Sequence, residues 1–352
     1  MKRPFDSTLL DGILGELEIA DIAQATIRQS GEIARRMEKA TGEEFSHLEM
    51  GVPGLRPEEI GVEAERAALA AGVASIYPPM QGIPQLKQAA SRFIKAFLDI
   101  DLAPEGCIPT VGSMQGSFTV FLLCSQLDPK RRKILFIDPG FPVQRSQTHL
   151  MDIPSVSFDI YDYRAEKLGE KLESYLSEGD VAAIVYSNPN NPAWICLTEQ
   201  ELEIIGRLAT KYDTIVVEDL AYLGMDFRKQ LGRPCEAPFQ PTVARYTDNY
   251  ILMLSGSKIF SYAGQRIAIA AISDKLYGRH YPALLERYRT PLRPARATRR
   301  SMRWPRCSTP RPTGGSTSWA MPRSTPAARS SRRSRSCATG SASSTTRTST
   351  RR

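Results

Sequence analysis

The sequence YILMLSGSKIFSYAGQR at residues 250–266 joins a short apolar run to a polar loop that carries one lysine. The apolar residues at 250–254 predict a buried strand. Lys258 follows in a predicted turn, where partial burial favours the neutral amine that attacks carbonyl groups. Ser255 and its small neighbours let a ligand approach closely, and Arg266 adds a fixed positive charge. A phosphate-bearing aldehyde requires this set of groups, although a lysine taken alone is more often a solvated loop residue.

Apolar runs alternate with helical patterns on both sides of this stretch. Strands are predicted at 107–111, 133–138, 155–160, 181–186, 214–218, 250–254 and 267–272. Helices are predicted at 9–40, 57–72, 84–98, 114–127, 165–178 and 199–211. Thr198 and Glu201 form a capping-box pattern at the start of the last helix. Short strands that alternate with helices indicate an α/β fold with a largely parallel sheet.

The positive net charge of the chain belongs to its last 62 residues. The 352 residues together have a formal charge of +8, which alone would suggest a nucleic-acid binder. Residues 291–352 contain 15 arginines and no lysine, aspartate or glutamate, whereas residues 1–290 contain 31 basic and 38 acidic side chains. The body of the chain is therefore an ordinary acidic protein, and no nucleic-acid partner is expected.

The segment 291–352 differs in composition from everything before it. It lacks Ile, Val, Phe, Tyr, Asn, Gln and His, and consists mostly of Ser, Thr, Arg, Pro, Ala and Gly. Such a composition cannot bury a core, so we predict that the segment is disordered. A shifted reading frame through GC-rich DNA would give this mixture. A native basic tail and a nucleic-acid-binding arm are the alternatives.

Cysteine usage and hydropathy predict a cytoplasmic protein without a membrane span. Cys107, Cys124, Cys196 and Cys235 show no metal-site spacing, and the first two lie in apolar runs typical of buried thiols. The N-terminal residues are followed by no apolar signal core, and no apolar run approaches the ~20 residues needed to cross a bilayer. Neither a metal nor a membrane partner is expected.

Small, aromatic or polar residues follow five of the predicted strands at the same end. They are Gly112 and Ser113 after 107–111, Phe141 after 133–138, Asn191 after 181–186, Asp219 after 214–218, and Lys258 after 250–254. Ligands of open parallel sheets bind beyond the carboxyl ends of the strands. These five loops are therefore expected to converge on one site.

Each of these residues has a chemical use and an ordinary structural alternative. The Gly-Ser pair opens a predicted helix whose free amides attract phosphate, or it simply caps that helix. Phe141 could stack on a flat ring or belong to the core. Asn191 and Tyr222 could donate to a phenolate oxygen, and Asp219 could hold a proton on a pyridine nitrogen. A turn asparagine and a helix cap are the corresponding alternatives.

Together these motifs resemble the class I and II aminotransferases, which are fold-type-I enzymes that depend on pyridoxal phosphate. The motifs are the Tyr77 loop ending at Gly82, Gly112-Ser113-Met114, Pro139-Gly140-Phe141, Asn188-Pro189-Asn190-Asn191-Pro192, Asp219-Leu220-Ala221-Tyr222, and Ser255 through Arg266. Each motif alone is weak, but six in the family's order are specific. The resemblance covers residues 20–290. It implies a fold-type-I large domain with a mainly parallel seven-stranded sheet and helices on both faces.

The resemblance also implies a role for each matching residue. Lys258 would form a Schiff base with pyridoxal 5′-phosphate, Asp219 would pair with its pyridine nitrogen, and Phe141 would stack on its ring. Asn191 and Tyr222 would contact the ring hydroxyl. The residues implied at the phosphate are Gly112, Ser113, Met114, Ser255 and Arg266, with Tyr77 reaching the phosphate of the other subunit of a homodimer. Gly51 and Asn191 are implied beside the substrate.

Two departures from the family pattern are present. The family continues its Asn-Pro motif with Thr-Gly, where this chain has Ala193-Trp194. The family also carries, well after the lysine, a small-domain segment with an arginine that clamps the substrate carboxylate, and nothing in 291–352 resembles it. We therefore predict a helical segment at 1–50 that contributes to the small domain and to dimer contacts. A cofactor-binding large domain is predicted at 51–290, followed by an aberrant tail at 291–352 that leaves the small domain incomplete.

The function implied is transfer of an amino group from an L-amino acid to a 2-oxo acid. In this interpretation Lys258 also moves the proton between the substrate Cα and the cofactor as general base and acid. Two alternatives use the same cofactor residues. One is a lyase that catalyses β-elimination, such as C–S cleavage, and the other is a truncated protein that binds the cofactor without turnover.

Overall fold

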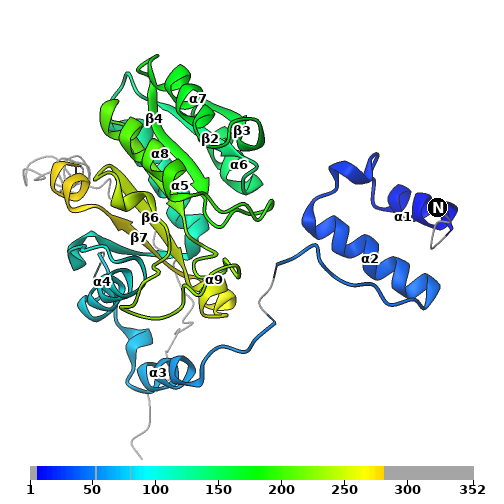
Figure 1. Ribbon diagram of the computed structural model, residues 1–352. Coiled ribbons are helices and arrows are strands. Elements are labelled where there is room, and N and C mark those ends of the chain that lie inside the picture. The colour runs from blue at the N-terminus through cyan, green and yellow to red at the C-terminus, as the bar shows by residue number, and fades with distance from the viewer. Residues whose placement is uncertain (1–5, 52–53, 80, 281–352) are drawn as a thin grey trace, which may run out of the picture. The chain divides into compact units, whose positions relative to one another are not determined.

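In the computed structural model, which describes residues 6–51, 54–79 and 81–280, seven strands form one sheet in the order β1-β7-β6-β5-β4-β2-β3 (Figure 1). The strands are β1 (Cys107–Val111), β2 (Lys133–Asp138), β3 (Ser155–Asp159), β4 (Val181–Ser187), β5 (Ile215–Asp219), β6 (Tyr250–Ser255) and β7 (Ile267–Ile272). Of these seven, β7 runs antiparallel to both of its neighbours, β1 and β6, and the remaining pairs are parallel. The predicted strands and the mainly parallel sheet are confirmed.

The helices agree with the predicted ones except near the N-terminus. They are α1 (Ser7–Glu16), α2 (Ile27–Thr41), α3 (Glu59–Ala70), α4 (Pro84–Leu98), α5 (Gly112–Leu127), α6 (Pro142–Leu150), α7 (Lys167–Leu176), α8 (Glu199–Lys211) and the short α9 (Gly256–Ile259). The prediction of one helix over 9–40 is wrong. Thr26 and Gln29 form a capping box that starts a new helix at Ile27, and Asp21 caps a separate 3-10 turn before it.

Both faces of the sheet are covered by helices, because alternate side chains of each strand point to opposite sides. On β2, Leu135 and Ile137 belong to a core formed with α4, α7 and α8, which we name the α8 face. Ile134 and Phe136 belong to a second core formed with α5, which we name the α5 face. The near-continuous apolar runs of the central strands follow from this double coverage.

The parallel strands end at one edge of the sheet, where the predicted site loops begin. Asp219 is the last residue of β5, the strand in the middle of the sheet. Val217 packs in the α5-face core and Val216 in the α8-face core. The alternation therefore sends Asp219 to the α5 face and its neighbour Glu218 to the α8 face.

Helices α1 and α2 pack on each other through a small apolar cluster that includes Ile13, Ile33 and Met37. Within the described residues, no helix combines the length and the hydrophobicity that a membrane span requires. The disorder predicted for 291–352 falls outside the described residues. The domain boundaries predicted after residues 50 and 290 stay predictions.

Candidate active site

Lys258 lies in the short helix α9, directly after β6, and its side chain is half-buried. The predicted turn is thus one helical turn, capped by Ser255, whose Oγ accepts a hydrogen bond from the amide of Ser257 at 3.2 Å. The Lys258 Nζ donates a hydrogen bond to the carbonyl oxygen of Gly51. Burial and the guanidinium of Arg266 both lower the pKa of Lys258. Both effects shift Lys258 toward the neutral amine, which is the form that attacks a carbonyl carbon.

Gly112 and Arg266 meet at the N-terminus of α5. Gly112 has a φ of +71°, and a Cβ built on it would lie 2.2 Å from an Nη atom of Arg266. Only glycine permits this conformation and this close approach. The Arg266 side chain is held by a hydrogen bond of 2.8 Å from Nη1 to the carbonyl oxygen of Ala263. The free amides of the helix and the guanidinium together form a cradle for phosphate or a similar anion.

The first turn of α5 is held in place by α6. The buried Gln147 donates from Nε2 to the carbonyl oxygen of Met114 at 2.8 Å, and its Oε1 accepts from Ser117 Oγ at 2.8 Å. Ser113 lies half-buried in the same turn, while 45% of the Met114 side chain is exposed. The backbone N–H groups predicted to bind phosphate therefore belong to a turn that the buried Gln147 side chain holds in position.

Asp219 is buried at the end of β5 and accepts two hydrogen bonds. Its Oδ1 accepts from the amide of Ala221 at 3.1 Å, and its Oδ2 accepts from Nε2 of Gln144 at 2.9 Å. Burial raises the pKa of Asp219 to about 6, although both hydrogen bonds lower it. A cation placed beside this carboxylate, such as a protonated pyridine nitrogen, would offset the cost of its burial.

Gln144 and Gln147 are site-supporting residues that the sequence analysis missed. Both lie on α6 and both are buried, with one oriented to Asp219 and the other to the first turn of α5. Their spacing of three residues places them on one face of the helix. That spacing of two long amides was the available signal, since buried glutamines require hydrogen-bond partners.

The structure brings Asn191 and Tyr222 together. The Asn191 Nδ2 donates to the Tyr222 hydroxyl at 3.1 Å. A Cβ built on Gly51 would lie 3.7 Å from the same hydroxyl, so the segment expected beside the substrate adjoins this pair. Burial, and then the charge of Asp219, raise the pKa of Tyr222, which keeps its hydroxyl protonated and able to donate.

The Ala193-Trp194 departure has a clear structural consequence. Trp194 has a φ of +58°, in the left-handed region that favours glycine. Its indole lies edge-on to the Tyr222 ring, with centroids 5.5 Å apart, and stacks on Phe227 at 6.4 Å. The tryptophan thus occupies a glycine-type conformation and packs its side chain against a predicted cofactor residue.

Phe141 and Tyr77 are less closely associated with the other predicted site residues. Phe141 is half-buried at the N-cap of α6. Tyr77 is 99% exposed and does not join the site of its own chain.

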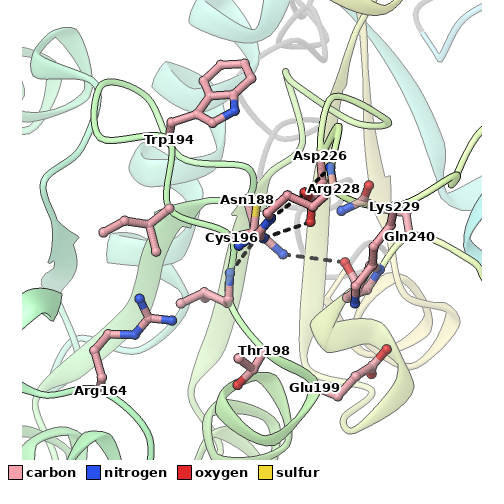
Figure 2. A pocket seen from close by; sticks show the side chains of 13 residues that line it. Arg164, Asn188, Trp194, Cys196, Thr198, Glu199, Asp226, Arg228, Lys229 and Gln240 are labelled. Atoms are coloured by element: carbon pink, nitrogen blue, oxygen red, sulfur yellow. Dashed lines mark hydrogen bonds and ion pairs between the residues drawn. The ribbon is translucent and has the colours of Figure 1, made fainter.

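A cavity of about 560 Å³ lies beside the Asn191 loop (Figure 2). Asn188 and Trp194 line it, together with Arg164, Asp226 and Arg228. The charges are largely paired, since Arg228 binds Asp226 through Nε at 2.8 Å and Nη2 at 2.9 Å. This cavity contains none of the predicted cofactor residues, but one of its walls is the back of the loop that presents Asn191.

Known proteins resemble this chain in sequence as well as in fold. The family described as aminotransferase class I and II matches residues 51–298. The aspartate aminotransferase of Pyrococcus horikoshii is 25% identical over 260 residues, which cover 72% of this chain and 61% of that protein. The aspartate/prephenate aminotransferase of Thermus thermophilus is 26% identical over 235 residues, which cover 65% of this chain and 56% of that protein.

A solved structure shares the fold. A tetra mutant of Thermus thermophilus aspartate aminotransferase complexed with tryptophan superposes with a TM-score of 0.61 at 22% identity, covering 74% of this chain and 65% of that one. The chain spans about three-fifths of the length of the curated relatives it matches.

Proposed function

This chain is a member of the class I and II aminotransferase family, and we propose that it transfers an amino group from an L-amino acid to a 2-oxo acid with pyridoxal 5′-phosphate as cofactor. The observation that carries the proposal is the pairing of Lys258, whose pKa is lowered, with the anion cradle of Gly112 and Arg266. An amine nucleophile beside a phosphate site is the minimum that a phosphorylated aldehyde requires.

The remaining residues of the site fit the same cofactor. The buried carboxylate of Asp219 suits a protonated pyridine nitrogen, and the hydroxyl and amide of Tyr222 and Asn191 suit the ring hydroxyl. We place Phe141 on the ring, and Ser113, Met114 and Ser255 with the phosphate cradle. When bound, the cofactor supplies an electron sink for negative charge at the substrate Cα.

The protein's own groups then have defined tasks. Lys258 Nζ would attach the cofactor, and it would accept and return the proton at the substrate Cα as general base and acid. Asp219 would hold a proton on the ring nitrogen. Asn191 and the backbone of Gly51 orient the carboxylate of the substrate.

The choice of amino acid and 2-oxo acid as substrates is supported by relatives that carry the names aspartate aminotransferase and asparagine–oxo-acid transaminase. Because the chain spans only part of those proteins, both substrates remain part of the proposal. We assign the large domain that binds the cofactor to residues 51–290.

We further propose that the protein is a cytoplasmic homodimer in which Tyr77 reaches the phosphate bound by the other subunit. Besides Tyr77, the exposed large apolar side chains include Leu48, Leu55, Ile60 and Ile76, which are 88%, 81%, 83% and 69% exposed. Large apolar side chains with this degree of exposure are candidates for burial against another subunit. Light scattering of the purified protein measures the mass directly, and a monomer at working concentration would refute this part.

The main test is the visible absorption spectrum of the full chain with pyridoxal phosphate, before and after addition of L-amino acids. We expect a cofactor band that is bleached by amino acids and restored by a 2-oxo acid. Borohydride reduction followed by peptide mass spectrometry should place the label on Lys258, and Lys258→Ala should abolish it. A band that amino acids leave unchanged would refute transamination, release of ammonia without transfer would indicate a lyase, and a label on another lysine would refute the assignment.

A further inference from the structure

Glu218 is a buried carboxylate that the proposed chemistry does not use. It precedes Asp219 on β5, faces the α8 face and is 0% exposed. Its Oε2 accepts from Thr242 Oγ1 at 2.6 Å and from the amide of Val243 at 3.1 Å. Its Oε1 accepts from Asn188 Nδ2 at 3.3 Å. The two oxygens therefore serve separate partners on two different loops, and the buried hydroxyl of Tyr186 lies beside the same carboxyl group.

Asn188 carries this contact into the loop that holds Asn191. It is 1% exposed, and its Oδ1 accepts from the amide of Leu197 at 3.1 Å. Its Nδ2 also lies 3.5 Å from the carbonyl oxygen of Pro241, and both residues line the cavity. Since Asn188 and Leu197 are the two ends of the loop, one buried side chain closes it.

The interior of the loop is filled by Asn190 and Ser187. Asn190 donates from Nδ2 to the carbonyl oxygen of Pro139 at 2.7 Å, and its Oδ1 accepts from the amide of Ala193 at 3.0 Å. The amide of Asn191 donates to Ser187 Oγ at 3.1 Å. Asn188 and Asn190 thus hold the loop in shape. The side chain of Asn191 is left to donate to Tyr222.

We propose that Glu218 and Asn188 are positioning residues for Asn191. The Asn188 oxygen is committed to the Leu197 amide, so its Nδ2 must face acceptors, and Glu218 Oε1 is the nearer of the two, with the carbonyl oxygen of Pro241 beside it. A buried acceptor of this kind determines which way the amide points. Glu218 thereby fixes the orientation of the Asn188 amide. Asn188 in turn holds the loop in the conformation in which Asn191 contacts Tyr222. The identity of the ligand rests on the proposed function, whereas the order of the loop can be measured without any ligand.

The substitution Glu218→Gln tests this geometry with a change of very few atoms. Thr242 and Val243 both donate to one oxygen, so the introduced carboxamide keeps its oxygen there and turns its NH2 toward the NH2 of Asn188. If the Asn188 amide rotates, its NH2 group faces the backbone N–H of Leu197 instead, so two donors again face each other. Two facing donors in a buried site cost a hydrogen bond on each side.

The double variant E218Q/N188D reverses the polarity of the pair. The introduced carboxylate at position 188 accepts both from the introduced carboxamide and from the Leu197 amide. The pair keeps one ionisable carboxyl group, and its total side-chain volume remains that of the wild type. The control is Thr242→Val, which removes a donor from the other oxygen of Glu218 in an equally buried place and leaves the Asn188 contact intact.

Two readouts are measured on the full chain. Hydrogen exchange of the cofactor-free protein reports the amides of Ala193 and Leu197, and a titration with pyridoxal phosphate gives the dissociation constant. We expect E218Q to speed exchange at both amides and to weaken binding about tenfold, as the loss of one buried hydrogen bond implies. The double variant should return both readouts to within about threefold of the wild type, and T242V should stay within about twofold even where it lowers the melting temperature.

The outcomes separate positioning from general destabilisation. Wild-type exchange and binding in folded E218Q would overturn the inference, as would a double variant no better than E218Q or a T242V protein as impaired as E218Q. If E218Q does not fold, Asn188→Ala replaces it, and loop exchange equal to that of T242V would then overturn the inference. If the wild type binds no pyridoxal phosphate, the proposed function fails, while the exchange comparison still decides the role of Glu218 and Asn188.

Discussion

Replacing Asp219 by asparagine should stabilise the cofactor-free protein at neutral pH while weakening cofactor binding. Burial raises the pKa of Asp219 from 3.8 to about 6. The difference of about 2 pH units corresponds to about 3 kcal/mol. Because the folded-state pKa lies above the unfolded one, the contribution of this group to stability is fully present below pH 3.8 and is lost as the pH rises through 6.

The neutral side chain removes that dependence. Gln144 can rotate its amide so that its oxygen accepts from the introduced NH2, which keeps the buried site satisfied. Urea denaturation of the cofactor-free proteins at pH 4 and pH 7.5 should therefore show a free-energy difference between D219N and wild type that moves by about 2.5 kcal/mol in favour of D219N, since a small part of the change already lies below pH 4. At pH 7.5 the affinity of D219N for pyridoxal phosphate should fall by about 10- to 100-fold, since a hydrogen bond to a charged group is lost.

Asp226 provides a control with the opposite sign. It is also buried, but its hydrogen bonds with Arg228 lower its pKa to about 2. Asp226→Asn should therefore lose stability at pH 7.5, and this loss should shrink as the pH falls toward 2. If both variants respond to pH with the same sign, or if D219N keeps a constant difference between pH 4 and pH 7.5, the reasoning from burial is refuted. Wild-type cofactor affinity in D219N would refute the assigned partner.

Three further predictions concern the cradle, the scaffold and the ring hydroxyl. Gly112→Ala forces a Cβ against Arg266 at a φ of +71°, so pyridoxal phosphate should bind at least about tenfold more weakly, by absorbance titration, with little change in secondary structure. Glu201→Gln should lower the free energy of unfolding by about 3 kcal/mol at pH 7, because Glu201 is buried and its hydrogen bonds nevertheless lower its pKa to about 2. The loss of stability should shrink as the pH falls from 4.5 toward 2. As a control, Glu203→Gln on the exposed side of the same helix should change the free energy of unfolding by less than about 0.5 kcal/mol. Tyr222→Phe removes the hydroxyl that lies 3.1 Å from the loop asparagine, and a cofactor affinity unchanged from wild type would contradict its assignment, which predicts a loss of about three- to tenfold.

The α/β architecture could be predicted because it depends on local periodicity. The strands β1 to β7 have five to seven residues each and most of them contain short apolar runs, and the helix at Glu199–Lys211 begins where its capping box predicts. The break between α1 and α2 was missed, because apolar residues recur with helical spacing on both sides of it. There the capping box at Thr26 starts a new helix, although the apolar periodicity alone would continue the first one.

The grouping of the candidate site residues was also predicted from the sequence. In a parallel sheet, residues that follow successive strands reach the same edge, so the order of the strands was enough to group Asp219, Asn191 and Lys258. The supporting residues could not be grouped in this way. Gln144 lies 75 positions from Asp219, and Asn188 lies 30 positions from Glu218, so nothing local relates either pair.

The sequence by itself therefore determined the order of strands and helices and the chemical identity of the groups at the strand ends, because both depend on residues near one another in the chain. Only the tertiary structure decided which oxygen of Glu218 serves which loop, how far burial raises the pKa of Asp219, and how closely Arg266 approaches Gly112. The physical reason is that burial and hydrogen-bond partners come from segments that are distant in sequence and meet only when the sheet and its two helical layers assemble.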